Sequence, residues 1–321
     1  MKEQTKPYRG AAYDDVFRTL LVDCRQLIIP VVNEVFRENY SGEEEIVFSQ
    51  NEHFLSQQEG RQEKRITDTS FTIVGVERRK YLMECQSRPD SRMLIRIFEY
   101  VTQIALDEGE LDKERLKVTF PRSAVIFLRS NRNTPDRMEI QISAPGQETL
   151  YEVRVIRLSD YTLDMIFQKN LLFLLPFYIF KHEKYFAEYE KDAVKLETLR
   201  EEYRYIAQRL DVLVEQGKIN TFMCKTLIQM SIKVAENVTI KYDKILKGVR
   251  EIMGGRILEY EAKTILREGM SHGVSQGKSQ TLVHSIDNLM KNLSLSLDEA
   301  CRAVGSSREE YQRAKELLAR G

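Results

Sequence analysis

Three side chains whose oxygen atoms could bind a cation lie on two neighbouring segments of the chain. Asp68 belongs to residues 65–74, and Glu84 and Gln86 belong to residues 79–86. Both segments are rich in strand-forming residues, and a glycine stands between them where a turn would lie. We therefore expect the two segments to form one β-hairpin.

The register of this hairpin decides whether the two carboxylates can act together. With a turn centred near Val76, Asp68 faces Glu84 across the hairpin, with Cβ atoms roughly 5 Å apart. Facing carboxylates repel each other unless positive charge lies between them, and a hard divalent cation supplies it. Gln86 points to the same face as Glu84. A slip of one residue would turn Glu84 over, and a solvated acidic face is the alternative to a cation site.

Apolar residues alternate with these polar residues along both segments. Such a period of two is typical of a strand with one buried face. The residues expected to face a core are Phe71, Ile73, Tyr81, Met83 and Cys85. The acids and Gln86 then share the opposite face.

The composition of the 321-residue chain is that of a globular protein with a sizeable core. Apolar residues make up 42% and charged residues 31%, which is typical of such a protein with much surface helix. Lys plus Arg and Asp plus Glu both number 49, so no overall basic charge indicates nucleic-acid binding. Any such binding must come from a local basic patch.

The four cysteines stand alone, at positions 24, 85, 224 and 301. Their spacing argues against a structural zinc site and against a disulfide framework, and it fits a reducing compartment. The most apolar run, residues 171–180, is too short to span a bilayer, and the first residues have no apolar signal core. The sequence thus predicts a soluble cytoplasmic protein without a membrane segment.

Apolar residues at helical spacing predict a first helix over residues 13–38. Pro30 should kink this helix or begin a second one, and Glu34 lies at the edge of its buried stripe. A further helix is expected after the hairpin, over residues 92–106. Strands are predicted at residues 46–49, 123–129, 138–142 and 150–158. This order of elements predicts a mixed α/β unit.

From about residue 162 the pattern becomes helical and remains so. We expect an apolar helix over residues 164–180 and a charge-alternating helix over residues 181–216. Gly217 should end the second helix, and Asn220 should cap the next.

The last part of the chain is expected to be a small helical tail. Glycines at positions 269, 273 and 277 line one side of a helix, which suits either a flexible hinge or a dimer seam. Helix starts are expected near residues 295–300 and 306–311. A helix-turn-helix would be a nonspecific interpretation of this tail, because the tail is not basic.

Several segments occur in a particular order along the chain. They are Tyr13–Phe17, Arg65–Asp68, Met83–Ser87, Arg92–Met93, Arg96–Tyr100, Leu174–Phe177 and the glycine-every-four tail with its Leu-Ser-Leu-Asp run. In this combination the chain resembles the PD-(D/E)XK nuclease superfamily, in particular the bacterial recombination-promoting nuclease/putative transposase family. The resemblance covers most of the chain.

The resemblance implies a restriction-endonuclease-like α/β core, with a mixed central sheet flanked by helices, over residues 1–180. An all-helical C-terminal region would follow, as a helical extension over residues 181–268 and a glycine-hinged tail over residues 269–321. It also implies a DNA endonuclease that uses Mg²⁺, or Mn²⁺ in its place, and that promotes recombination or transposition-like DNA movement.

The same resemblance implies roles for the site residues. Asp68 and Glu84 occupy the positions of the metal-binding acids, and the main-chain carbonyl of Cys85 joins them. Glu34 best matches the helical acid that completes such sites. The usual third motif residue is Lys, and here it is Gln86, which can hydrogen-bond a water or the phosphate but supplies no positive charge.

DNA-phosphate contacts are expected from basic residues around the hairpin. Arg92, Arg96 and Tyr100 follow one another at four-residue spacing, on one face of the helix that leaves the hairpin. Arg65 lies on the first hairpin segment. A local group of this kind matters more than net charge, because phosphate contacts carry most nonspecific affinity.

A double-strand cut needs two active sites, so a homodimer through the C-terminal helices is the expected assembly. Two other function classes remain open. The first is a catalytically inactive relative that binds DNA or a protein, which Gln86 favours. The second is a helical scaffold or regulatory protein, in which the helices from residue 181 onward do the work.

Overall fold

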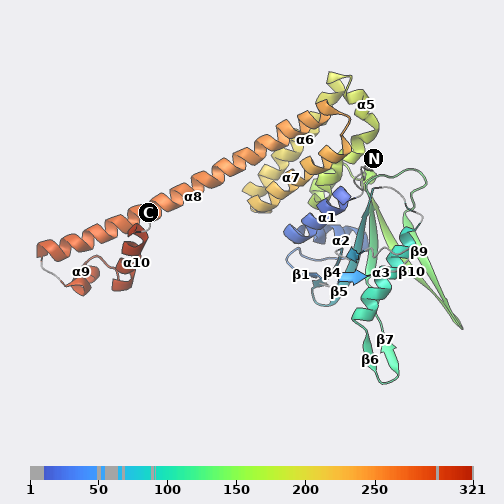
Figure 1. Ribbon diagram of the computed structural model, residues 1–321, viewed down its shortest axis with the longest axis horizontal. Coiled ribbons are helices and arrows are strands. Elements are labelled where there is room, and N and C mark those ends of the chain that lie inside the picture. The colour runs from blue at the N-terminus through green and yellow to red at the C-terminus, as the bar shows by residue number, and fades with distance from the viewer. Residues whose placement is uncertain are drawn as a thin grey trace, which may run out of the picture. The chain divides into compact units, whose positions relative to one another are not determined.

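The computed structural model describes residues 11–48, 52–54, 64–66, 69–87, 90, 92–293 and 296–319. The chain divides into two compact units, Met1–Ile257 and Leu258–Gly321. The first unit is an α/β domain built on one large sheet with helices around it (Figure 1).

Six strands form the central sheet in the order β1-β4-β5-β8-β10-β9. β5 pairs with β8 and β8 pairs with β10 in parallel, whereas the other neighbouring pairs are antiparallel. The predicted mixed α/β class is therefore confirmed. The strands are β1 (Glu45–Phe48), β4 (Ser70–Val74), β5 (Arg78–Gln86), β8 (Arg122–Phe127), β9 (Arg137–Ala144) and β10 (Gln147–Arg157).

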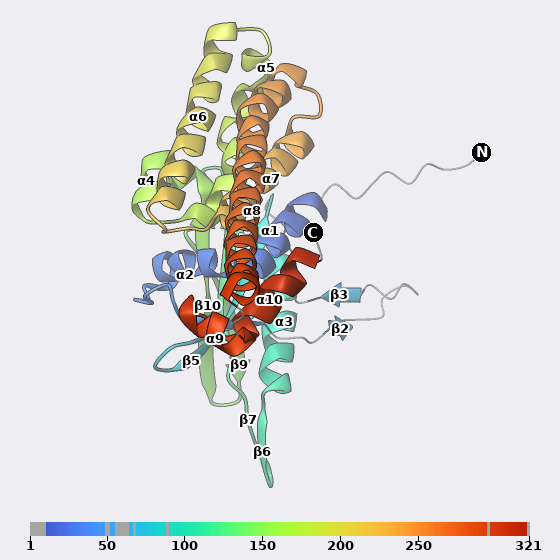
Figure 2. The ribbon, with the colours of Figure 1, turned by 90° about the vertical axis from the view of Figure 1, so that its left-hand side faces the viewer.

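Helices cover both faces of this sheet (Figure 2). α3 (Met93–Asp107) packs on the face that carries Leu82. On the opposite face, Phe36 of α2 (Ile28–Phe36) meets Tyr81 with ring centroids 5.1 Å apart. Leu82 and Tyr81 are both fully buried. Since neighbouring residues of a strand point to opposite faces, β5 is buried on both sides.

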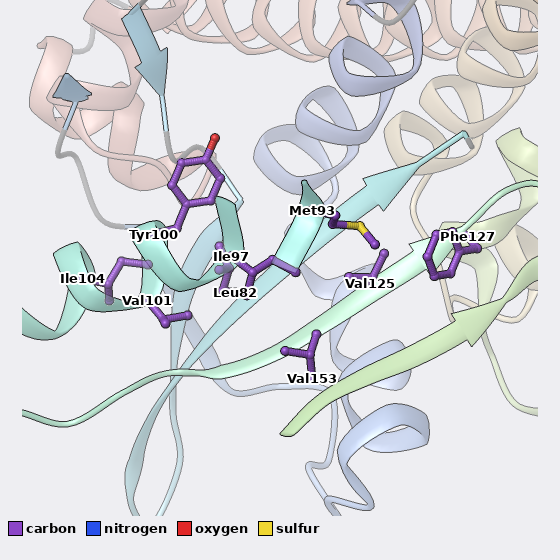
Figure 3. Close-up of a cluster of buried hydrophobic side chains, with 9 residues drawn as sticks. All are labelled: Leu82, Met93, Ile97, Tyr100, Val101, Ile104, Val125, Phe127 and Val153. Carbon is purple, nitrogen blue, oxygen red and sulfur yellow. The ribbon is translucent and has the colours of Figure 1, made fainter. Parts of the chain in front are cut away.

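The core beneath α3 combines one stripe of the helix with apolar side chains from three parallel strands (Figure 3). The helical members recur every three or four residues, which places them on one face of α3. The cluster consists of Leu82, Met93, Ile97, Tyr100, Val101, Ile104, Val125, Phe127 and Val153.

The β4–β5 hairpin has the predicted register. Ser70 pairs with Leu82 and Val74 pairs with Arg78, which centres the turn on Val76. The expected apolar set, Phe71, Ile73, Tyr81, Met83 and Cys85, is buried throughout. The register and the burial of this apolar set are thus confirmed for the described part of the hairpin. The expected single buried face is wrong, because Ser70 and Leu82 on the opposite face are buried as well.

The first hairpin segment differs from the prediction, because residues 65–74 do not form one strand. β3 (Lys64–Ile66) pairs with β2 (Glu52–Phe54) in a separate two-stranded sheet, and β4 begins only at Ser70. The buried sheet suits the apolar part of the segment, whereas its basic first residues would lose hydration there.

The first helical region is broken before Pro30 rather than at it. α1 (Ala11–Asp23) is followed by the 3₁₀ turn η1 (Arg25–Leu27), and α2 begins at Ile28. Pro30 therefore lies in the first turn of α2, where its missing N–H costs no helical hydrogen bond.

The helices after residue 162 pack onto the N-terminal helix. α7 (Thr221–Val238) contacts both α1 and the 3₁₀ segment η3 (Leu172–Tyr185). The ring of Phe17 in α1 packs edge-on against the ring of Phe173 in η3, with ring centroids 5.1 Å apart. Residues on both sides of position 180 thus belong to one core in the first unit.

Both long helices predicted in this region are interrupted. Asn170, with a φ of 56°, separates α4 (Leu163–Gln168) from η3, because asparagine tolerates the left-handed conformation. Asp192 accepts main-chain N–H groups of the next helix, α6 (Ala193–Glu215), and so fixes its start. α5 (Phe186–Tyr189) lies between η3 and α6.

The predicted signals at the end of α6 are confirmed. Gly217 has a φ of 69°, which is the conformation expected of a glycine that follows a helix. Asn220 caps α7, since its Oδ1 accepts the main-chain N–H of Met223 at 2.7 Å.

The second unit contains the C-terminal part of α8 (Asp243–Leu293) with α9 (Leu297–Ala303) and α10 (Arg308–Ala319). Its small core includes Ile286, Ala300, Cys301 and Tyr311. Ser296 and Glu299 form a capping box at the start of α9, which confirms the predicted helix start. The glycines at 269, 273 and 277 lie within α8, and whether they form a hinge or a dimer seam stays a prediction.

One hairpin has no counterpart in the sequence predictions. β6 (Glu110–Asp112) and β7 (Arg115–Lys117) follow α3 and pair antiparallel. Each strand has three residues, too few for an alternating pattern to be recognised. No helix in the described parts of the chain combines the length and apolar content needed to cross a membrane.

Leu82→Ala should destabilise the first unit strongly. The side chain is fully buried between β5 and α3, so its removal should lower the free energy of unfolding by about 2–5 kcal/mol. Ile95→Ala on the exposed side of α3 is the matched control and should change it by less than about 0.5 kcal/mol. Equal urea midpoints for the two variants would contradict this packing.

Candidate active site

Glu84 lies near the carboxyl end of β5, on the face covered by α3. Its partner on β8 is Val125, and Leu82 precedes it on the same face. Thr69 donates from Oγ1 to Glu84 Oε1 at 3.2 Å. A carboxyl group is thus held at the border of an apolar core. Ligands of open α/β sheets commonly bind outside the carboxyl ends of the strands.

Burial raises the pKa of the Glu84 carboxyl above its usual value. The nearby charge of Asp14 raises this pKa further, whereas Arg96, the hydrogen bond from Thr69, and Arg18 lower it. Removal of water penalises the charged form of a carboxyl group. The folded protein therefore holds Glu84 with an increased affinity for a proton.

Asp14 is the second acid of this site and comes from the first turn of α1. Asp14 is exposed, yet partial desolvation of its carboxyl raises its pKa, and Arg18 and Arg96 lower it. Asp14 and Glu84 thus interact with the same two arginines. Two carboxyl groups from separate elements share one electrostatic environment.

The two arginines reach this environment from different helices. Arg18 follows Asp14 by one helical turn, so both lie on one face of α1. Arg96 of α3 donates from Nη1 to Asp90 Oδ2 at 3.0 Å, and Asp90 Oδ1 accepts the main-chain N–H of Arg92 at 2.9 Å. Asp90 thereby connects the side chain of Arg96 to the start of α3.

Cys85 and Gln86, which follow Glu84, point to opposite sides of β5. Gln86 is half-buried on the same side of β5, and its carbonyl accepts the N–H of Leu128 at 2.9 Å. Cys85 points to the other side, where burial raises the pKa of its thiol well above the usual value and the charges of Asp14 and Glu84 add to this effect. A protonated thiol is a poor nucleophile, and the expected role of the Cys85 main-chain carbonyl as a metal ligand stays a prediction.

Glu34 lies in a different polar cluster. Lys169 donates from Nζ to Glu34 Oε1 at 2.6 Å, and Tyr161 donates its hydroxyl to the same oxygen at 3.1 Å. Burial and the charge of Glu34 raise the pKa of Tyr161. The helical acid that the structure brings to Glu84 is therefore Asp14.

Two predicted site residues lie outside the structural description. Asp68 is not among the described residues, and neither is the side chain of Arg65, whose main chain belongs to β3. Asp68 as a partner of Glu84 and Arg65 as a phosphate ligand stay predictions. Thr69 is the described residue of this segment that reaches Glu84.

The three predicted phosphate ligands on α3 differ in exposure. Arg92 is exposed at the start of the helix, and Arg96 is half-buried beside Asp90. Tyr100 is buried in the core with its hydroxyl directed away from the other side chains of that cluster (Figure 3). Arg92 is the most accessible of the three to a ligand.

The sequence predictions missed Asp14 and Arg18 as site residues. Asp14 belongs to the Tyr13–Phe17 segment that carries part of the family resemblance. The Asp-to-Arg spacing of four residues was a local signal for a shared helical face. Their proximity to Glu84 depends on how α1 packs against β5, which spacing does not reveal.

Comparison with protein-family models, with curated proteins and with solved structures gave no match for this chain. Among the described residues, no three His, Cys, Asp or Glu side chains are gathered closely enough to hold a metal ion. Asp14 and Glu84 form a pair of acids with two guanidinium groups.

Glu84→Gln should stabilise the folded protein at neutral pH, in the presence of EDTA. The raised pKa means that ionisation of Glu84 weakens folding above its usual pKa, so its removal should add on the order of 1 kcal/mol to the free energy of unfolding. Glutamine retains the oxygen that accepts from Thr69.

The sign of this effect gives it a pH dependence. Below about pH 4 Glu84 is protonated in both folded and unfolded states, and the difference between the variant and the wild type should disappear. Glu139→Gln, at an exposed strand position beside Arg137, is the control. An E84Q variant less stable than wild type at pH 7 would contradict this assignment.

Proposed function

We propose that this chain is a metal-dependent DNA endonuclease with a PD-(D/E)XK-type site. The observation that supports this proposal is the pairing of Asp14 and Glu84, from α1 and β5, beside Arg18 and Arg96. Desolvation raises the pKa of both carboxyls, so burial penalises their charged forms. A divalent cation would remove that penalty.

The donors available here suit Mg²⁺ or Mn²⁺. Glu84, Asp14 and the main-chain carbonyl of Cys85 all offer hard oxygen atoms, and Mg²⁺ is commonly held by one or two carboxylates together with water. Asp68, if it faces Glu84 as the register predicts, would add a third carboxylate. The bound ion would supply Lewis acidity and lower the pKa of a bound water.

The protein itself would supply the remaining interactions. Arg96 and Arg18 provide positive charge near the acids, a role that Gln86 cannot take in place of the usual Lys. Gln86 can orient a water or a phosphate oxygen by hydrogen bonding. Charge placed beforehand where negative charge develops on the phosphate is the main source of rate in such reactions.

DNA is the proposed substrate because α3, which supplies the charge of Arg96 to the acids, also carries the predicted phosphate ligands. Arg92 is exposed at the N-terminal end of α3, where the helix dipole also favours anions. Arg65 and Tyr100 are the further candidates from the sequence. Recombination or transposition-like DNA movement is the proposed role, and a homodimer through the C-terminal helices the proposed assembly.

Asp14→Asn and Glu84→Gln should each abolish Mg²⁺-dependent nicking of supercoiled plasmid, with a loss of about 100-fold or more. Asp15→Asn is the matched control, because Asp15 neighbours Asp14 on α1 but forms an ion pair with Lys233. Thermal unfolding of each variant checks that the fold is intact. Unchanged nicking by both site variants would refute the assignment.

Mg²⁺ should raise the melting temperature of the wild-type protein but not that of Glu84→Gln. A ligand that binds only the folded state at 100 times its Kd adds about 2.7 kcal/mol to the free energy of unfolding. The measurement is a thermal melt with MgCl₂, MnCl₂ or EDTA, with Glu139→Gln as the control. Equal shifts in wild type and E84Q would place metal binding elsewhere.

A DNA-binding relative without catalytic activity is the second candidate. Gln86 in place of Lys favours it, as does the ion pair that commits Arg96 to Asp90. Such a protein would shift labelled duplex DNA in a gel but would not cut it with Mg²⁺ or Mn²⁺. The endonuclease would both shift the DNA and cut it.

A further inference from the structure

Arg129 lies two residues past the end of β8, and its guanidinium contacts several elements at once. It donates from Nη2 to Glu183 Oε1 at 2.8 Å, and its Nε pairs with the other oxygen of the same carboxylate. Its Nη1 donates to the carbonyl of Ser87 at 3.3 Å. The guanidinium also stacks over the ring of Phe180, 4.5 Å from the centroid.

The same group reaches the start of α1. Burial lowers the pKa of Arg129, but the hydrogen bonds and charges of Glu183 and Tyr13 more than offset this, so its pKa is raised. Tyr13 in turn meets Phe180 edge-on, with ring centroids 5.0 Å apart. One planar cation therefore joins α1, the end of β5 and η3.

These contacts involve residues close in sequence to both acids of the candidate active site. Ser87 directly follows Gln86 at the end of β5, and Tyr13 directly precedes Asp14 on α1. The N–H of Leu128, the residue before Arg129, donates to the carbonyl of Gln86. Arg129 thus contacts Tyr13 within α1, directly before Asp14, and Ser87 directly after β5, the strand that carries Glu84.

We propose that Arg129 is a positioning residue, which fixes the distance between Asp14 and Glu84 by holding Tyr13 and Ser87 against η3. The catalytic part of this proposal rests on the proposed function. A guanidinium suits this role better than an ammonium, because its rigid fork holds Glu183 by two bonds while its face stacks on an aromatic ring. In this role η3, in the helical part of the first unit, supports the residues that follow the carboxyl ends of β5 and β8.

Arg157 offers a matched control at the end of the next parallel strand. It pairs with Asp160 at 2.8 Å and Asp136 at 2.7 Å, and it donates to the carbonyl of Thr134 at 3.3 Å. Its side chain is 30% exposed and that of Arg129 is 24% exposed. Both arginines are thus part-buried, paired with carboxylates and bonded to a main-chain carbonyl, but only the partners of Arg129 adjoin the acids in sequence.

The test compares Arg129→Met with Arg157→Met by hydrogen–deuterium exchange of the full chain. Peptides covering residues 13–20 and 84–87 should exchange about 10-fold faster in R129M and unchanged in R157M. With plasmid substrate and Mg²⁺, kcat of R129M should fall about 10- to 100-fold while KM stays within about two-fold. Arg129→Lys should recover part of the loss.

The outcomes separate the two proposals. If R129M and R157M exchange alike at these peptides, Arg129 is not a positioning residue. If wild-type protein does not cut DNA, the proposed endonuclease fails, and the exchange comparison still decides whether Arg129 fixes the two segments. Should R129M fail to fold, two other variants test the same contacts: Glu183→Gln removes the ion pair with Arg129, and Phe180→Leu removes the ring beneath its guanidinium. Each should give a smaller increase in exchange at the same peptides. Wild-type exchange in both variants would overturn the proposal.

Discussion

The central constraint in this structure is that β5 is buried on both faces and yet carries a carboxyl group. Tyr81 and Leu82 fill the two sides of the strand, and Glu84 follows directly on the side that α3 covers. Because its surroundings are poor in water, Glu84 depends on the charges that neighbouring helices bring to it. The positions of α1 and α3 are therefore both packing features and electrostatic ones.

The acid at position 84 lowers the stability of the fold and at the same time creates a potential binding site. A half-buried position beside Val125 would be more stable with an apolar residue than with an acid whose ionisation is penalised. Such a penalty is common where charges are held ready for a ligand or a reaction. The helices after residue 162 are part of this arrangement, since η3 meets α1 through two aromatic pairs and Arg129.

Much of the sheet could be predicted from local sequence patterns. The β4–β5 register followed from a glycine-marked turn and from alternating apolar residues, and both signals act within a few residues. The caps at Asn220 and Ser296 are equally local. The predictions were wrong where tertiary packing overrides a local sequence pattern. The first helix is broken before Pro30, the predicted helix over residues 164–180 is interrupted at Asn170, and β3 pairs with β2 instead of continuing into β4.

The sequence by itself determined the class of the fold, the approximate positions of the central strands along the chain and the face of β5 on which Glu84 and Gln86 lie, because alternation and turn chemistry are properties of adjacent residues. Only the tertiary structure decided which distant charges meet Glu84. It brought Asp14 and Arg96 to this carboxyl and assigned Glu34 to Lys169. Interactions of that kind depend on how whole helices dock on a sheet, which is set by the sum of many apolar contacts and not by the spacing of the charged residues.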